Sequence, residues 1–420
     1  MSGMERPSGG SGALAGVRVC DFGGQLAGAG ATKILAALGA EVIRVEDPVT
    51  RGRWDAMRGV GPFVDDRRGV DLGGGFNNHN VGKLGITLNT RTERGKELLA
   101  RLVAECDVVT ENFAAGVLER WGFGYERLRE IRPDVVYVSN CGFGHTGPQR
   151  DFKTWGPIVQ ALSGLTFTAG LPGEEPSGWG FSYMDHIAAY YMTVAILAAL
   201  HHRSVTGAGA HVDLASTSAG LSMLHTEILD STVNGRPSRR EGEPHGNRAD
   251  FGSMSPHGVY PAEGDDRWVA IACRDDTDWQ ALRSLVGGET LSSPDLDHLA
   301  GRLAHADALD AALSHWTASQ DAAEAAARLV AAGVPASVVA TPPERIDEDA
   351  EVADWGLFPV VDHPEMGRVR VEGLPFHLSL TDWSIEAAAP CLGQHTDDVL
   401  QRLLGLGPDE LRELHEEGVL

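Results

Sequence analysis

The feature of the sequence that most constrains the fold is a β-α-β pattern close to the N-terminus. The apolar run Val17–Phe22 predicts a strand, a glycine-rich turn follows it, and residues Thr32–Leu38 have the composition of a helix. Gly39 is suited to cap that helix, and Glu41–Glu46 predicts the next strand. Strands joined by a helix pair in parallel with a right-handed crossover, so the pattern predicts an open parallel sheet.

The same alternation continues toward residue 140. Helices are predicted at 92–105 and 118–131, and short buried strands at 107–110 and 134–139. Residues 155–180 are rich in Gly and Pro and are predicted to be a loop. An apolar helix is then predicted at 186–203, and its longest uncharged run is shorter than the ~18 residues that span a membrane.

The composition of the sequence changes near residue 230, where it becomes polar and charged with Gly and Pro, and this change predicts a domain boundary. Residues 13–225 are predicted to form a large α/β domain with an open, Rossmann-like parallel sheet, and 226–245 a linker. Residues 246–345 are predicted to form a smaller α+β domain, and 346–420 a return linker and C-terminal segment that packs on the large domain. Residues 1–12, rich in Gly, Ser and Pro, are expected to be a disordered tail and no signal peptide.

The composition excludes several classes of partner. The formal net charge is −24, which disfavours nucleic acid and anionic membranes. The five cysteines are scattered without a CxxC pair, and the histidines lack metal-ligand spacing, so we expect no metal and a cytoplasmic location. Between Arg44 and Arg101, however, basic residues outnumber acidic ones, which is typical of a solvated surface of mixed charge and is also compatible with a site for a phosphorylated small molecule.

The glycine-rich turn resembles a dinucleotide fingerprint only in part. Gly28 and Gly30 have the required spacing, but Lys33 takes the place of the third glycine, where close packing of helix and strand needs a small residue. NAD is therefore not expected. A helix N-terminus after such a turn can still receive an anion or a carbonyl oxygen.

Asp185 is the carboxylate with the most interesting position, directly before the long apolar helix. One interpretation is a helix N-cap. The other is a nucleophile for acyl chemistry, and the helix N-terminus would help to keep it ionised. Cys141 after a strand is an alternative nucleophile, although buried cysteines are more often inert.

Several motifs in order give the chain a resemblance to the class III CoA-transferases, the family of formyl-CoA, carnitine and benzylsuccinate CoA-transferases. The resemblance covers nearly everything from Leu14 to Leu420. The motifs that carry it are Gly16–Val19, Leu38–Pro48, Asn80–Leu88, Asp107–Phe113, Gly142–Pro148, Asp185 with Thr206–Gly209, and Leu392–Asp397.

The resemblance implies a chain-threaded, interlocked homodimer and an enzyme of the CoA-transferase class (EC 2.8.3.-). Asp185 is then the nucleophile, which passes CoA from an acyl-CoA donor to a carboxylic acid acceptor through an aspartyl anhydride and an aspartyl-CoA thioester. No metal and no permanent cofactor are implied, because coenzyme A is a substrate.

By their places in the motifs, a further set of residues is implied to contact coenzyme A. These are Asn112, Phe113, Arg120 and Lys153, with Gln25 in the first turn and Arg51, Arg53 and Arg58 in the region of the CoA phosphates. Guanidinium groups suit phosphate because of their bidentate geometry.

Departures from the family pattern leave the acyl pair open. Leu26 stands where formyl-CoA transferases have Gln, with Gln25 one residue earlier, and the shielding glycine-run loop has no counterpart between Asn234 and Gly258. Both argue against formyl-CoA and oxalate as substrates. An α-methylacyl-CoA racemase is the alternative, but its His has no counterpart in Trp155–Gly164. A non-catalytic CoA-binding protein is a third interpretation.

Overall fold

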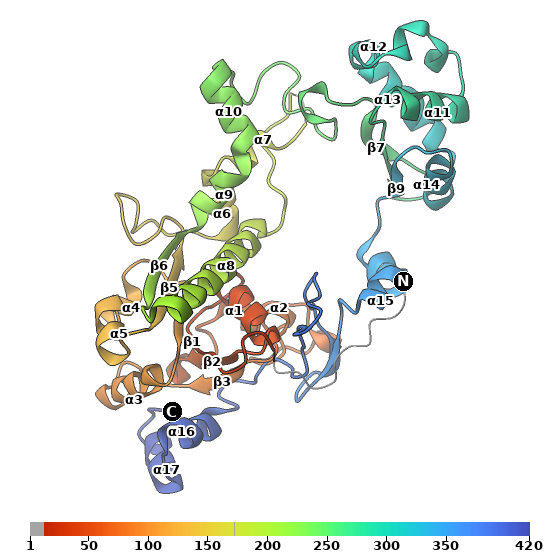
Figure 1. Ribbon diagram of the computed structural model, residues 1–420. Coiled ribbons are helices and arrows are strands. Elements are labelled where there is room, and N and C mark those ends of the chain that lie inside the picture. The colour runs from red at the N-terminus through yellow and green to blue at the C-terminus, as the bar shows by residue number, and fades with distance from the viewer. Residues whose placement is uncertain (1–11, 172) are drawn as a thin grey trace. The chain divides into compact units, whose positions relative to one another are not determined.

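The computed structural model describes residues 12–171 and 173–420 (Figure 1). It forms two compact units. The large unit contains the residues up to 166 together with 178–228 and 351–420, and the small unit contains 167–177 and 229–350. The small unit is thus inserted into the chain of the large one. The expected tail lies, up to residue 11, outside the described residues.

The large unit is built on a six-stranded sheet in the order β3-β2-β1-β4-β5-β6, with every neighbouring pair parallel. This confirms the predicted α/β class. The strands are β1 (Arg18–Asp21), β2 (Glu41–Glu46), β3 (Leu84–Thr87), β4 (Val108–Glu111), β5 (Val136–Cys141) and β6 (Ala210–Ala215). The strand order reverses between β1 and β4, and ligands of such sheets bind beyond the carboxyl ends of the strands at that point.

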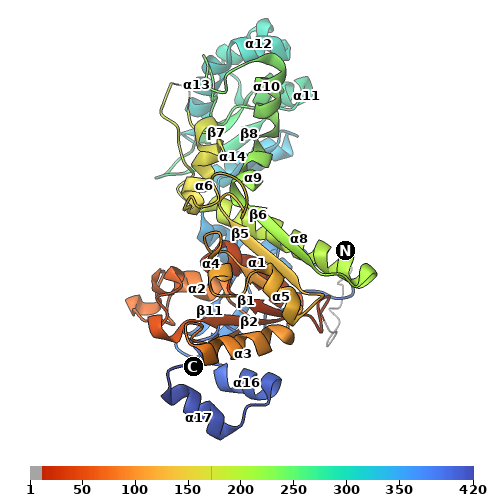
Figure 2. The same ribbon diagram turned by 90° about the vertical axis from the view of Figure 1, so that its left-hand side faces the viewer.

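Alternating side chains of these strands fill two apolar layers. Val19 and Val108 pack against α1 (Ala27–Ala37) and α8 (Tyr183–Thr206) on one face. Cys20 and Val109 point to the other face. That second face is covered by α3 (Glu93–Ala104), α5 (Tyr125–Ile131), α16 (Thr396–Leu404) and α17 (Pro408–Glu416). Figures 1 and 2 show α16 beside α3.

The helix α8 is long and apolar enough to cross a membrane by length and composition alone, with a mean hydropathy of 1.2 over its most apolar window. In the structure one side of it packs on α1, β5 and β6. Core helices of this kind pass the same test, so the finding is weak evidence for a membrane span.

The remaining elements of the large unit are short. They are α2 (Gly74–His79), α4 (Val117–Arg120), α6 (Gly156–Leu162), α9 (Ser216–Leu221), α15 (Ala350–Trp355), β10 (Val360–His363) and β11 (Gly367–Arg370). The helices α7 (Leu165–Thr168) and α10 (His225–Asn234) lie where the chain passes between the units.

Several predicted boundaries were wrong. The helix expected from Thr32 begins at Ala27, because the glycine-rich segment forms its first turns. The loop expected at 155–180 contains α6 and α7. Near the C-terminus, Gly405 with a φ of 69° ends α16 and separates it from α17.

The small unit is an antiparallel three-stranded sheet with helices. Its strands β7 (His257–Pro261), β8 (Trp268–Ala272) and β9 (Ala336–Val338) are arranged in that order. The helices are α11 (Asp276–Val286), α12 (Leu299–Ala304), α13 (Ala306–Thr317) and α14 (Ala322–Ala331). They pack around Trp279, which is fully buried.

Candidate active site

A cavity of about 310 Å³ lies at the carboxyl ends of the central strands and contains Asp185. Its walls come from the connections that follow β1, β4 and β5 and from the first turns of α6, α8 and α9. The lining residues include Gln25, Asn112, Phe113, Asn140, Cys141, Phe152, Lys153, Trp155, Gly156, Asp185 and Ser216. The cavity therefore brings together six residues that the sequence singled out: Gln25, Asn112, Phe113, Cys141, Lys153 and Asp185.

Asp185 lies inside α8 and is not its N-cap, which corrects the simpler interpretation of the sequence. The helix begins at Tyr183, Ser182 occupies the cap position, and Asp185 belongs to the first turn. The Ser182 side chain forms a hydrogen bond with its carboxylate, and burial raises the pKa of Asp185 to about 6. The helix N-terminus was expected to favour the anion, but loss of hydration outweighs that effect.

Gly156 makes room for the carboxylate. A Cβ atom at this position would lie 2.5 Å from Oδ2 of Asp185, which is too close for any larger residue without a shift. The start of α6 can therefore approach Asp185 only because residue 156 is glycine.

The turn after β1 is held in an unusual conformation beside Asp185. Gln25 has a φ of 54°, and its N–H donates to Oδ2 of Asp55 over 3.1 Å. Asn112 accepts a hydrogen bond from the N–H of Gly24 (2.7 Å) and donates one to its carbonyl (3.1 Å). The Asn112 side chain thus fixes the turn by bonding to both backbone groups of Gly24.

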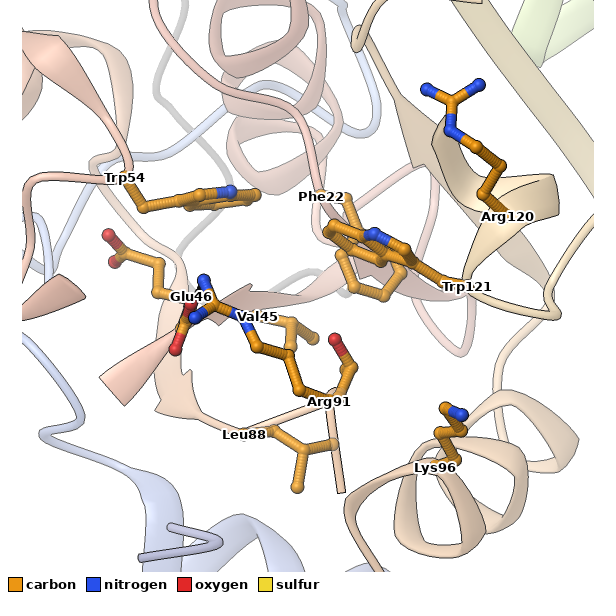
Figure 3. A pocket seen from close by; sticks show the side chains of 11 residues that line it. Phe22, Val45, Glu46, Trp54, Leu88, Arg91, Lys96, Arg120 and Trp121 are labelled. Atoms are coloured by element: carbon orange, nitrogen blue, oxygen red, sulfur yellow. Dashed lines mark hydrogen bonds and ion pairs between the residues drawn. The ribbon is translucent and has the colours of Figure 1, made fainter. Parts of the chain in front are cut away.

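A second cavity, of about 300 Å³, has aromatic side chains in its walls (Figure 3). Its walls include Trp54 and Trp121, whose ring centres lie 5.5 Å and 5.2 Å from that of Phe113. Phe113 lines the Asp185 cavity, and its ring contacts two rings that line the second cavity, so it connects the two. Neither tryptophan is marked by a pattern in the sequence.

The second cavity is rich in cations, as Figure 3 shows for Arg91, Lys96 and Arg120. Arg91 pairs at 2.7 Å with Asp47, which lines the same cavity, and Lys96 pairs at 2.8 Å with the exposed Glu93. Among the residues that the structure describes, Arg120 and Lys153 form no ion pair. The local excess of basic residues in the sequence was the signal that could have found Arg91 and Lys96.

The three arginines expected near the CoA phosphates lie away from both cavities. Arg58 is buried and bonded to Glu46 (2.6 Å) and Asp71 (2.8 Å), so its guanidinium holds the framework together. Arg51 and Arg53 are exposed and line a separate hollow of about 440 Å³. Within 12–171 and 173–420 there is no group of three or more His, Cys, Asp or Glu placed to hold a metal ion.

Comparison with known families places the chain. The model of CoA-transferase family III matches residues 14–396, so the chain belongs to this family. The family resemblance read from the sequence is confirmed. The protein is an enzyme, a CoA-transferase, and CoA thioesters are its class of substrate.

Relatives cover almost the whole chain. Succinyl-CoA–D-citramalate CoA-transferase of Chloroflexus aurantiacus is 32% identical over 96% of this chain and 97% of its own length. Formyl-CoA:oxalate CoA-transferase of Streptomyces coelicolor is 33% identical over 97% and 99%. The crystal structure of a CaiB/BaiF family protein from Brucella suis superposes with a TM-score of 0.83, at 30% identity, over 94% of this chain and all of that one.

Proposed function

We propose that the enzyme moves CoA from an acyl-CoA donor to a carboxylic acid acceptor, with Asp185 as the nucleophile. The observation that carries the proposal is a half-buried carboxylate, without a cationic partner in the described part of the chain, in a cavity beyond the carboxyl ends of the sheet. With a pKa of about 6 the group is ionised at neutral pH, yet it has lost much of its hydration. A poorly hydrated carboxylate of this kind is suited to attack a thioester.

The first half-reaction exchanges one acyl bond for another. The Asp185 carboxylate attacks the thioester carbonyl, the carbon–sulfur bond breaks, and the CoA thiolate leaves with the electron pair. The product is a mixed anhydride. The thiolate then attacks the aspartyl carbonyl of that anhydride, which releases the donor acid as its carboxylate and leaves an aspartyl-CoA thioester.

The second half-reaction is the reverse with another acid. The acceptor carboxylate attacks the aspartyl thioester and expels the thiolate. The thiolate then attacks the acceptor's carbonyl in the new anhydride, which frees the Asp185 carboxylate and gives the new acyl-CoA. No proton is gained or lost overall, so no general base is required, but water must be kept from the anhydride.

The two cavities fit the two ends of coenzyme A. The aromatic and cationic cavity suits the nucleotide, since Trp54 and Trp121 offer faces for stacking and Arg120 an unpaired charge for phosphate. The pantetheine arm would pass Phe113 and present its sulfur to Asp185, with Lys153 as a further unpaired cation. Arg51, Arg53 and Arg58 are not needed in this arrangement.

A homodimer is supported by the outer side of α8. Tyr190, Tyr191, Val194 and Val205 are exposed there, the last by 73%. An apolar stripe of this kind on a core helix is commonly covered by a protein partner. We propose that a second copy of the chain covers it, with the interlocked arrangement of the family. The free cysteines fit the reducing cytoplasm, which we propose as the location.

The experiment that tests the function is covalent trapping. The enzyme is incubated with a panel of acyl-CoA donors that includes formyl-, oxalyl- and succinyl-CoA, and then treated with hydroxylamine. We expect an Asp185 hydroxamate on the peptide with Met184 and His186, only when a reactive donor was present, and new CoA esters when acids are added. Asp185→Asn should form neither product. Asp151→Asn, the same change at an exposed carboxylate, should form both.

The racemase alternative gives the opposite pattern. A racemase forms no aspartyl adduct, and it exchanges the α-proton of its substrate with deuterated solvent in the absence of any acceptor acid. Deuterium incorporation across the panel without adduct or inactivation would replace the proposal by proton-transfer chemistry.

A further inference from the structure

A buried carboxyl group belongs to the residue two positions before Phe113, which lines the Asp185 cavity. Glu111 is the last residue of β4 and is only 1% exposed. Its Oε2 accepts a hydrogen bond from the backbone N–H of Phe113 over 2.6 Å, and its Oε1 accepts one from the hydroxyl of Tyr137 over 3.0 Å. Glu111 therefore ties the backbone that enters the Asp185 cavity to the neighbouring strand β5.

A buried imidazole links this carboxyl to a second one. Nε2 of His145 lies 3.4 Å from Oε1 of Glu111, and Nδ1 lies 3.7 Å from Oε1 of Glu119. Neither ring nitrogen has a well-aligned hydrogen bond in the structure. The backbone N–H of His145 donates to both carboxylate oxygens of Asp213 on β6 (2.9 Å and 3.0 Å), and these bonds fix the backbone position of His145.

The two carboxyl groups frame the connection that forms the walls of both cavities. Glu111 precedes Asn112 and Phe113, and Glu119 precedes Arg120 and Trp121. The first pair lines the Asp185 cavity and the second pair lines the aromatic cavity. The imidazole of His145 lies between Glu111 and Glu119 and thus contacts both ends of this connection.

The proposed mechanism assigns no step to Glu111, Glu119, His145 and Asp213, although the burial of such polar groups costs free energy. No arginine or lysine of the described chain pairs with Glu111, Glu119 or Asp213. Burial, together with the charges of Glu119 and Asp213, raises the pKa of Glu111 to about 8. At neutral pH the carboxyl therefore keeps its proton. Its O–H group can then donate a hydrogen bond to the facing Nε2 of His145. Buried polar groups are retained at such cost where they hold a specific geometry.

We propose that Glu111 and His145 are positioning residues for coenzyme A, which fix the connection from Asn112 to Trp121 and so place both cavity walls. Neither residue touches the substrate. The inference rests on the proposed use of the two cavities by coenzyme A, and it adds residues that act through Phe113 and Arg120.

The test compares deletion of the carboxyl with its conservative replacement. In Glu111→Ala the N–H of Phe113 loses its acceptor, and we expect the Kd of free CoA and the KM of acyl-CoA to rise about 10- to 100-fold. The KM of the acceptor acid and kcat should change by less than about threefold. Glu111→Gln keeps an acceptor for Phe113 and a donor toward His145, so CoA affinity at pH 7 should stay within about threefold of wild type.

A second variant and a control protect the test against misfolding. His145→Ala leaves the Glu111 bonds to Phe113 and Tyr137 in place and should weaken CoA binding about 5- to 10-fold. Glu126→Ala removes an exposed glutamate from the nearby helix α5 and should leave CoA affinity unchanged. Calorimetric stoichiometry reports the folded fraction, so a smaller amount of active protein is not mistaken for weaker binding.

A pH series gives a readout that a purely structural role would not move. As the pH rises through about 8, Glu111 ionises, and the new buried charge should weaken CoA binding in the wild type and leave Glu111→Gln unaffected. Ionisation of the CoA thiol is common to both proteins and cancels in the comparison. The titratable groups that face Glu111 or its neighbours are Glu119, Asp213, Tyr137, Cys141, His145 and His211.

The outcomes separate this inference from the proposed function. If the wild type neither binds CoA nor transfers it, the proposed function fails. If the wild type binds CoA, and folded Glu111→Ala and His145→Ala bind it within about twofold of wild type, the positioning role is refuted and the function stands. A loss confined to kcat would likewise refute it, because it would assign the pair to the chemical step.

Discussion

The ionisation of Asp185 predicts an acid limb in the pH profile of the enzyme. Attack on a thioester requires the carboxylate, and burial raises the pKa of Asp185 to about 6. About 90% of the groups are then ionised at pH 7 and about 10% at pH 5. We therefore expect kcat/KM to fall roughly tenfold between these pH values.

The Ser182 hydroxyl offers a direct way to move this limb. Its hydrogen bond favours the charged form of Asp185 and holds the pKa below the value that burial alone would give. A hydrogen bond to a charged group contributes about 1.5–3 kcal/mol, and one pKa unit corresponds to about 1.4 kcal/mol. Because Asp185 is partly solvated, we take the lower end and expect Ser182→Ala to raise the midpoint by about one unit.

The expected loss depends on pH in a characteristic way. With the midpoint near 7, Ser182→Ala should be about twofold slower than wild type at pH 7, about fivefold slower at pH 6 and equal to it above about pH 8.5. The assay is kcat/KM for a saturable acyl-CoA donor from pH 5 to 9. Ser204→Ala, an exposed serine near the other end of α8, is the matched control. A midpoint that does not move, or a loss that is the same at every pH, would refute this assignment.

Three further predictions follow from the same geometry. Asp185→Asn should raise Tm, and by more at pH 7.5 than at pH 4.5, because a carboxyl with a raised folded-state pKa destabilises the fold once it ionises; equal shifts by scanning calorimetry would contradict the burial argument. Arg120→Ala and Lys153→Ala should each weaken the binding of free CoA about 5- to 50-fold in titration calorimetry, with kcat little changed. Unaltered affinity in both variants would remove the two residues from the binding site. Analytical ultracentrifugation down to nanomolar concentration should show a dimer throughout, and a stable folded monomer would count against the interlocked assembly.

Local patterning was enough to predict the sheet but not the ends of its helices. The strands around Val19 and Val108 are short, apolar and separated by helical segments, and these signals are local. The start of α1 was missed because Gly28 and Gly30 suggested a turn. In the fold Gly28 is required by close approach, since a Cβ there would lie 2.6 Å from Oδ1 of Asn112. That contact joins residues far apart in the sequence, and no local rule reports it.

The candidate site shows the same division. Asp185 was found because a carboxylate at the start of an apolar helix stands out, and Phe113 because its motif resembles a family. Trp54 and Trp121 were missed, since a single tryptophan in a polar segment carries no pattern until the fold brings it beside another ring. The ion pairs of Arg58 with Glu46 and Asp71 were not foreseen, because a sequence does not show which carboxylates the fold places beside a guanidinium.

The C-terminal segment has a consequence for how the protein is made. The core on the α3 face of the sheet is completed by Val399, Leu400, Leu411 and Leu414, and the N–H of Asn89 donates to the carbonyl of Val419. A ribosome delivers these residues long after the six strands and after the whole inserted small unit. The small unit can therefore close its own core during synthesis, while the large unit keeps an open apolar face until α16 and α17 have been made.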